Sequence, residues 1–527
     1  MQRDIVLTWK EAIALLGCIT YFLVVCFIYL PGRASLTYTG LFVDDTFIFF
    51  RYAEHLASGL GFVWNPGEPP VEGFSSIGWV FLLTLGHRLT DLPIPTIALW
   101  AGVAFAGITI ILVWITTCRL LEPPNRKFAI LAPVVLATTP LIARHACSGM
   151  ETTMVMCAYA TLFIVVAGAQ TPTIRGAAFV GILSGLFYLV RPDSVLIGFL
   201  VPFCVYAISG SQGMSLKAMQ DPLVRNRLLA FMLVFLVVFV TMTLIRWWYF
   251  GSFLPPPAYM KLGLARPGAG SASSLKFIFS QWAEFPAYIA YLLVPITWGM
   301  TLRTARRPLE VGLLLAGVAF AIYQLQVIPI MNFQFRFFTP LLALLSILAA
   351  LACVRIGNRL ATKPHGAGLA CFAFAAVSFL ASIGNLHSSR SDTDPHFDLQ
   401  GVAEALRDVG PITIAYSEAG VVPFYSKQRF IDYAGLNDLL IARNRDGAPG
   451  FYWPYVRNRY GLPDVYFEPP REYASYASFE SVPEIASQYE LNVTCGVQIW
   501  ILTSSRHAAS IRNALKQVAC HQTSSTS

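Results

Sequence analysis

The chain has 527 residues, of which 56% are hydrophobic and only 13% are charged. Soluble domains carry about 25% charged residues, so this composition excludes an ordinary soluble protein and favours one embedded in a membrane. The net charge of +8 does not indicate a nucleic-acid partner, because most Lys and Arg residues lie in short loops between apolar segments, where membrane proteins place them.

The first apolar segment, from Glu11 to Leu30, is long enough to cross a bilayer. It follows Arg3 and Lys10 and lacks the small-residue cleavage site of a removable signal peptide. The basic flank predicts a cytoplasmic N-terminus, which places the next loop, residues 31–95, on the extracytoplasmic side.

This first outer loop contains two adjacent carboxylates, Asp44 and Asp45, followed by a predicted amphipathic helix. Polar residues recur on one face of that helix, at Arg51, Glu54, His55 and Ser58. A helix of this kind directly after a membrane span is expected to lie along the interface. The apolar stretch from Ile77 to Leu89 is shorter than the roughly 20 residues of a span, so we predict a second interfacial helix there.

Ten more apolar segments are predicted to cross the membrane, at about 96–117, 127–143, 151–168, 174–190, 193–208, 228–250, 286–302, 309–330, 337–354 and 366–384. If Ile77–Leu89 does not cross, every basic loop cluster falls on the cytoplasmic side; if it crosses, all of them fall outside. We therefore predict a polytopic α-helical membrane domain over residues 1–384, with about eleven transmembrane helices.

The composition changes after residue 384, where charged residues, Tyr, Pro and Asn become more frequent and no further span follows. Strand-like segments at Ile412–Tyr416, Arg429–Tyr433 and Val497–Thr503 alternate with helix-like segments at Gly401–Val409 and Arg506–Val518. This alternation predicts a C-terminal extracytoplasmic α/β domain over residues 385–527.

The two adjacent aspartates are the first candidates for chemistry. Either Asp44 or Asp45 can be a helix N-cap, but two carboxylates at a membrane rim also suit a general base. Glu72 lies in the same loop, where an ordinary solvated carboxylate is the alternative. Glu151 can simply favour the start of a helix.

Several cations lie on the predicted outer side, against the usual positive-inside trend. They are Arg144 with His145, Arg191 with Asp193, Lys261 after three prolines, and Arg336. Each cation can snorkel to lipid headgroups, and Arg191 can instead pair with Asp193 within a turn. Together they suit an anionic ligand such as a lipid phosphate. No zinc spacing or nucleotide-binding motif appears in a convincing context, so no cofactor is predicted and a divalent metal remains open.

These motifs, in this order, resemble the GT-C glycosyltransferases, membrane enzymes that use polyprenyl-phosphate sugars. The segment from Asp44 to Trp79 is most similar to the bacterial branch that contains the mycobacterial terminal β-arabinofuranosyltransferase. Further similar segments are Ser148–Glu151, Arg191–Asp193, Tyr249–Lys261, Arg336–Phe338, Ala415–Gly420 and Ile431–Asp438. The chain departs from the family pattern at Pro255–Ala258, where Pro-Asn-Thr is usual, and at Glu418, where Asp is common.

The resemblance implies an inverting glycosyltransferase in the bacterial inner membrane, with its site on the extracytoplasmic side. It would move a sugar, with arabinofuranose as one candidate, from a polyprenyl-phosphate donor to a glycan or lipid-linked acceptor. Asp44 and Asp45 map to the catalytic pair. We assign Lys261, Arg336, Arg191 and Arg144 to the donor phosphate, and Arg51, Glu72, His145, Glu151 and Asp193 to substrate contacts. The alternatives are a non-catalytic relative in envelope or motility assembly and, less well supported, a transporter.

Overall fold

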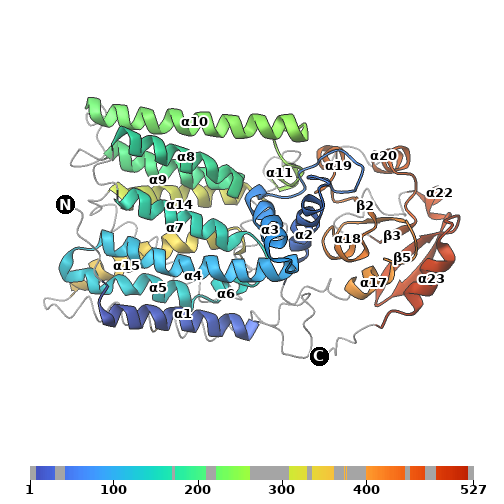
Figure 1. Ribbon diagram of the computed structural model, residues 1–527, viewed down its shortest axis with the longest axis horizontal. Helices are drawn as coiled ribbons and strands as arrows, with labels where there is room; N and C mark the ends of the chain where they lie inside the picture. Colours follow the sequence, from blue (N-terminus) through green and yellow to red (C-terminus); the bar gives the residue numbers. More distant parts are fainter. Residues whose placement is uncertain are drawn as a thin grey trace.

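The computed structural model describes residues 7–29, 42–168, 173–208, 221–261, 308–328, 335–360, 373, 376, 399–444, 451–468 and 482–519. Long helices run side by side in a bundle, and a small domain built around a β-sheet lies at one end of that bundle (Figure 1). We call this end of the bundle the sheet end. The arrangement is that of a mostly helical membrane domain with a C-terminal α/β domain.

The bundle helices are α1 (Trp9–Tyr29), α4 (Ile94–Leu120), α7 (Thr152–Gly168), α8 (Ile174–Val190), α9 (Val195–Ile208), α10 (Pro222–Phe250), α14 (Pro308–Gln326) and α15 (Leu342–Leu360). Among the described residues, five helices are long and apolar enough to cross a membrane, or six if one bent pair counts as a single span. Helices α7, α8 and α9 are apolar but shorter. The span predicted at 286–302 lies outside the described residues, and so does 366–384 apart from residues 373 and 376.

The span predicted at 127–143 is not one straight helix. The structure has a 3₁₀ segment, η2 (Pro123–Ile130), followed by α5 (Leu131–Thr138) and α6 (Pro140–Ala146), with a bend of 58° before α6. The bend follows from Pro140, which lacks a backbone N–H and disfavours helical geometry in the residue before it. Thr139 accordingly has an extended backbone, with ψ of 116°.

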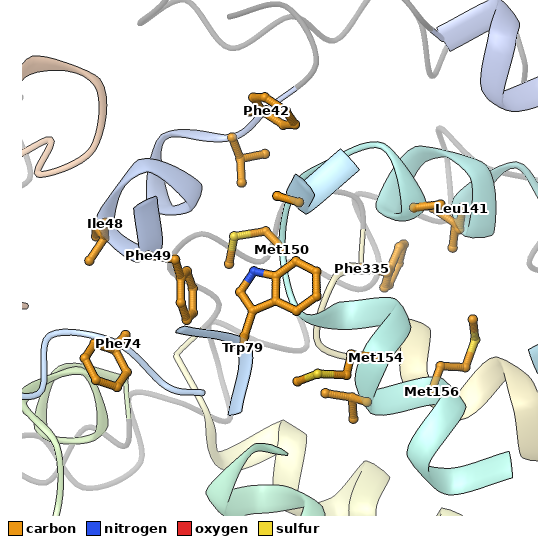
Figure 2. Close-up of a cluster of buried hydrophobic side chains, with 14 of the residues drawn as sticks. Phe42, Ile48, Phe49, Phe74, Trp79, Leu141, Met150, Met154, Met156 and Phe335 are labelled. Atoms are coloured by element: carbon orange, nitrogen blue, oxygen red, sulfur yellow. The ribbon is translucent and has the colours of Figure 1, made fainter. Parts of the chain in front are cut away.

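The first outer loop forms two helices, α2 (Asp44–Ala57) and α3 (Ile77–Thr90), which lie between the bundle and the sheet domain (Figure 1). Neither is long enough to span a membrane, in agreement with the prediction for Ile77–Leu89. Figure 2 shows Trp79 of α3 among the apolar side chains that anchor this loop on the bundle. The Trp79 indole N–H also donates to the carbonyl of Gly149 (3.0 Å), so the loop is fixed by packing and by a buried hydrogen bond.

The C-terminal domain has a five-stranded sheet in the order β2-β1-β3-β5-β4. Its strands are β1 (Thr413–Tyr416), β2 (Arg429–Asp432), β3 (Val465–Phe467), β4 (Tyr489–Thr494) and β5 (Val497–Leu502). Strand β1 pairs in parallel with β2 and β3, whereas β5 pairs antiparallel with β3 and β4. Its helices are α17 (Leu399–Ala405), α18 (Val421–Ser426), α19 (Leu439–Asn444), α20 (Tyr452–Arg459), α22 (Pro483–Ala486) and α23 (Ala508–Lys516). The three predicted strands are confirmed as β1, β2 and β5, whereas β3 and β4 were not predicted.

The amphipathic pattern predicts that the polar face of α2 lies open at an interface. In the structure the C-terminal domain covers part of this face: Arg51 is buried and Glu54 pairs with Lys427, whereas Ser58 is exposed. The Arg51 guanidinium donates to the carbonyls of Trp64 (3.0 Å), Gln428 (3.0 Å) and Pro423. Asn65 binds both backbone groups of Phe430 on the edge strand β2, at 2.9 and 3.0 Å. The sheet domain is therefore held on the first outer loop by buried hydrogen bonds, which cost free energy if left unmade.

Candidate active site

Three cations meet around one aromatic ring at the sheet end of the bundle. The charged groups of Arg336, Lys261 and Arg191 lie 5.0, 5.1 and 5.6 Å from the ring centroid of Phe337. Lys261 ends the short helix α11 (Pro256–Lys261), which lies at the sheet end (Figure 1). We call Arg191, Lys261, Arg336 and Phe337 the cation cluster. The structure thus brings together three of the four cations assigned to the donor phosphate.

Asp45 faces this cluster. Its Oδ2 lies 3.2 Å from Nη1 of Arg336 and 3.9 Å from Nζ of Lys261. Burial lowers the pKa of Lys261 to about 8, a shift that Asp45 opposes and the neighbouring Arg336 and Arg191 reinforce. Lys261 therefore titrates close to physiological pH.

Asp44 has a different environment, although it is the preceding residue in the chain. Its Oδ1 accepts the backbone N–H of Val421 at the start of α18 (2.8 Å). A Cβ on Gly420 would lie only 1.9 Å from the Asp44 carbonyl oxygen, so the glycine permits this close approach. The contact joins Asp44 to the backbone of the C-terminal domain.

Two more carboxylates complete the charged site on the far side of Arg191. Asp193 accepts two hydrogen bonds from Arg191, at 2.7 and 3.0 Å, and Glu151 lies 3.6 Å from Nη1 of the same guanidinium. Burial alone lowers the pKa of Arg191, but these two carboxylates outweigh it and raise the pKa above its usual value. The paired arrangement that the sequence left as an alternative for Arg191 and Asp193 is present, and Arg191 still lies in the cation cluster.

A cavity of about 500 Å³ begins at the cation cluster and extends into the bundle. Beyond the charged groups its wall is almost wholly apolar, with Val195, Leu196 and Phe199 from α9 and Phe235 and Phe239 from α10. Phe239 and Phe235 lie about 16 and 22 Å along α10 from its end at Phe250, as estimated from the 1.5 Å helical rise. We call this space the amphipathic cavity, because one end is cationic and the rest is apolar.

Two guanidinium groups in this cavity retain unused donors. Nε of Arg336 and Nη1 of Arg191 are buried and make no hydrogen bond within the part of the chain that the structure describes. Buried donors of this kind usually have a partner. The cationic end of the cavity is formed by the side chains of Arg191, Arg336 and Lys261.

A small cleft of about 20 Å³ lies beside Asp45 and adjoins the cation cluster. It is lined by Asp45, Ser75, Pro257 and Leu436, and it shares Lys261 and Arg336 with the amphipathic cavity. Asp45 thus lies between the cation cluster and a cleft whose wall includes the C-terminal domain.

Four other predicted site residues lie elsewhere. Arg144 and His145 are buried in α6 and line neither the amphipathic cavity nor the cleft. Glu72 forms a buried ion pair with Arg246 of α10 (2.7 Å), and burial raises the pKa of Glu72 to about 7 against the opposing effect of Arg246. Arg51 holds the C-terminal domain, as described above, and it too lines neither space, which gives no support to a substrate contact.

Sequence reasoning missed the residues that organise the cluster. Phe337 lies beneath all three cations and belongs to the segment Arg336–Phe338 that resembles the family, but no role was predicted for it. Arg443 of α19 was also missed: it donates to Tyr259 (3.1 Å) and Ser252 (3.3 Å), within and beside α11. In the described part of the chain, no group of three or more His, Cys, Asp or Glu side chains is placed to hold a metal ion.

Comparison with protein families and curated proteins gives one match, in the C-terminal part of the chain. Residues 394–509 match a family described as a domain of unknown function, DUF8728. No curated protein matches the sequence.

Solved structures match over nearly the whole chain. ArnT from Cupriavidus metallidurans bound to undecaprenyl phosphate is 12% identical, with a TM-score of 0.58 over 94% of this chain and 99% of that one. The Archaeoglobus fulgidus oligosaccharyltransferase in its apo form is 12% identical, with a TM-score of 0.60 over 94% of this chain and 75% of that one. AglB from Archaeoglobus fulgidus, in complex with an inhibitory peptide and a dolichol-phosphate, is 12% identical, with a TM-score of 0.57 over 96% and 78%. The chain therefore has the GT-C fold.

Proposed function

We propose that the protein is an inverting glycosyltransferase that moves a sugar from a polyprenyl-phosphate donor to a glycan or lipid-linked acceptor. The observation that carries this proposal is the amphipathic cavity, which combines a cationic end with a long apolar wall. A polyprenyl phosphate has the complementary chemistry, an anionic headgroup on a long hydrocarbon tail. The fold is shared with ArnT bound to undecaprenyl phosphate and with AglB in complex with a dolichol-phosphate, which supports the same ligand class.

The headgroup contacts follow from the cation cluster. Arg336 and Arg191, which line the cavity, would offer guanidinium N–H groups to the phosphate oxygens, and Lys261 would add a point charge. The prenyl chain would follow the apolar wall between α9 and α10. The same cations would stabilise the negative charge that grows on the phosphate as the sugar leaves.

Asp45 is our candidate for the general base. The acceptor hydroxyl oxygen would form a bond to the anomeric carbon while the bond from that carbon to the phosphate oxygen breaks. The hydroxyl proton would pass to the Asp45 carboxylate, and polyprenyl phosphate would leave as the anion. A bound phosphate would compete with Asp45 for Arg336 and Lys261, which lie 3.2 and 3.9 Å from the carboxylate, and would release it for this role.

We further propose that the sheet end faces the extracytoplasmic side of a bacterial inner membrane. Helix α10 begins at the opposite end of the bundle (Figure 1), and basic residues gather at that end, with Arg225 and Arg227 in the first turns of α10 and Arg119 in the last turn of α4. Cys495 in the C-terminal domain is disulfide-bonded, which suits an oxidising compartment. The sequence resemblance supports arabinofuranose as the first donor sugar to test.

The test combines binding and transfer with the full chain in lipid nanodiscs. We expect undecaprenyl phosphate to bind the wild type, and label to move from one member of a panel of polyprenyl-phosphate sugars to a membrane glycan. Replacing Arg336 by Gln should weaken undecaprenyl phosphate binding by about 10- to 100-fold, since a hydrogen bond to a charged group contributes about 1.5–3 kcal/mol.

The matched control is Arg359→Gln, because Arg359 is exposed near the end of α15 and lies outside both the amphipathic cavity and the cleft. This variant should bind as the wild type does. Binding of undecaprenyl phosphate without transfer from any donor would favour the non-catalytic alternative, and the absence of both would overturn the proposal.

A further inference from the structure

A second cavity, of about 230 Å³, lies where three parts of the chain meet. The first outer loop contributes Glu68–Glu72, the segment after α10 contributes Ser252 and Leu254–Pro256, and the C-terminal domain contributes Asn437–Leu440 and Arg459. We call it the polar cavity. It exists only because the C-terminal domain is seated on the first outer loop.

The polar and amphipathic cavities lie on two sides of one wall. Leu254 and Pro255 line both cavities, and the adjacent prolines Pro256 and Pro257 line the polar and the amphipathic cavity respectively. Three consecutive prolines restrict the backbone, so this wall is stiff. Helix α11 carries Lys261 directly after it, which links the wall to the cation cluster.

The charges that line the polar cavity are balanced. Glu72 pairs with Arg246 (2.7 Å), Glu68 with Arg429 (2.9 Å) and Asp438 with Arg459 (3.9 Å), and most of the other lining residues are apolar. Such a wall does not attract a phosphate, whereas carboxylate oxygens can accept further hydrogen bonds from hydroxyl groups. The lining therefore favours an uncharged ligand that is rich in hydroxyl groups.

The polar cavity also adjoins the cleft at Asp45. The cleft at Asp45 is lined by Gly73–Ser75, Leu436 and Pro257, which directly adjoin the residues of the polar cavity on the same three segments. At the junction, the Tyr52 hydroxyl accepts from the backbone N–H of Gly73 (3.1 Å) and donates to Asn437 (3.0 Å). The polar cavity and the cleft at Asp45 are therefore neighbours along these three segments, with the Tyr52–Asn437 contact between them.

We propose that the polar cavity binds the acceptor, a neutral polyhydroxylated glycan, and directs its terminal residue toward Asp45. The inference rests on the proposed function, because it assigns the acceptor of that reaction. The cavity is smaller than the ~300–1,000 Å³ of typical small-molecule sites, which suits the end of a glycan rather than a whole oligosaccharide. Donor and acceptor then approach Asp45 from opposite sides of the proline wall.

The test narrows the polar cavity without altering the cation cluster. Leu440 lines the cavity and is 44% exposed, which places it at the mouth, so Leu440→Trp adds bulk there. The probe is the pool of neutral oligosaccharides released from the envelope of the source cells, titrated at a saturating concentration of the labelled donor. We expect the half-saturating oligosaccharide concentration to rise about tenfold, with the Kd of undecaprenyl phosphate within twofold of the wild-type value.

The matched control is Leu491→Trp on β4, where Leu491 is 48% exposed and lies outside the polar cavity. It should leave both quantities unchanged. A second variant, Glu68→Gln, keeps the size of the side chain and an oxygen that can accept from Arg429, and removes one charge; it should raise the half-saturating concentration severalfold.

The outcomes separate the two proposals. Transfer by Leu440→Trp and Glu68→Gln with wild-type half-saturation would overturn the acceptor assignment and leave the proposed function standing. Equal loss in Leu491→Trp would also overturn it, because the effect would not be local. A wild type that neither binds undecaprenyl phosphate nor transfers sugar would overturn the proposed function itself.

Discussion

Asp44 and Asp45 are adjacent in α2, yet their side chains contact two different regions of the molecule, the C-terminal domain and the cation cluster. Asp45 points at side chains, with Arg336 and Lys261 as its partners, whereas Asp44 accepts a backbone N–H from the C-terminal domain. Successive residues of a helix point about 100° apart, so the first turn of α2 can serve both regions. A side-chain ion pair can exchange its partner for a ligand, but a backbone hydrogen bond across a domain contact fixes position. The comparison assigns chemistry to Asp45 and assembly to Asp44.

The sharpest way to break this comparison is to neutralise each aspartate in turn. Asp45→Asn should lower the rate of sugar transfer by about 10²- to 10⁴-fold, the usual contribution of a general base. Its binding of undecaprenyl phosphate should be kept or tightened, because the amide no longer competes for Arg336 and Lys261. Asp44→Asn keeps an oxygen that accepts the Val421 N–H, so its transfer rate should stay within about tenfold of wild type.

Initial rates with labelled donor and Kd values for undecaprenyl phosphate would be measured on all three proteins in nanodiscs. Equal losses in the two variants would remove the distinction between them. Full activity in Asp45→Asn would contradict the assignment of the base.

A smaller effect is expected from separating the two regions at Gly420. In Gly420→Ala the new methyl group would lie 1.9 Å from the Asp44 carbonyl oxygen, so the backbone must move. Overpacking of this kind typically costs about 1–3 kcal/mol. We expect faster hydrogen exchange of the Val421 amide and a lower transfer rate, with undecaprenyl phosphate binding preserved because the amphipathic cavity contains no residue of the described C-terminal domain.

The control for this variant is Gly401→Ala in α17, where the nearest atom to a new Cβ, on Val518, is 3.5 Å away. It should be neutral or stabilising by about 0.5–1 kcal/mol, since alanine suits a helix better than glycine. Unchanged protection of Val421 in Gly420→Ala would show that the contact does not hold the domain.

Hydrophobic length was enough to predict a helical bundle from sequence, because an apolar span leaves a direct signal in one segment. The number of spans and their orientation, which were inferred from charge, stay predictions. The predicted strands Ile412–Tyr416 and Arg429–Tyr433 were found for the same local reason, whereas β3, with three residues, is too short to show a period. Pro140 disfavours helical geometry at Thr139, so the sequence contains a local signal for the bend inside the predicted span 127–143, although the prediction treated that span as one straight helix.

The site was only half predictable, and the reason is its long-range contacts. Lys261 and Arg336 stand out as cations near helix ends, but nothing local places either of them beside Asp45. Arg51 was difficult to interpret for another reason. A polar stripe on a helix indicates that it faces a polar environment, but water, lipid headgroups and another domain each provide one. Only the fold shows that Gln428 and its neighbours occupy that face.

The last predicted effect concerns pH. It tests whether Lys261 contacts the phosphate bound at the cation cluster. Its pKa of about 8 means that the ammonium is present below pH 8 and is lost as the pH rises through that value. A bound phosphate favours the charged form of Lys261. Above about pH 7, where the phosphate monoester is already mostly doubly ionised, the Kd of undecaprenyl phosphate should be nearly constant to about pH 7.5 and then rise, by at most about tenfold per pH unit above 8. Lys261→Arg should abolish this rise, because arginine stays charged throughout the range. A wild-type Kd that does not change between about pH 7 and 9.5, or an identical rise in Lys261→Arg, would place the phosphate elsewhere in the cavity.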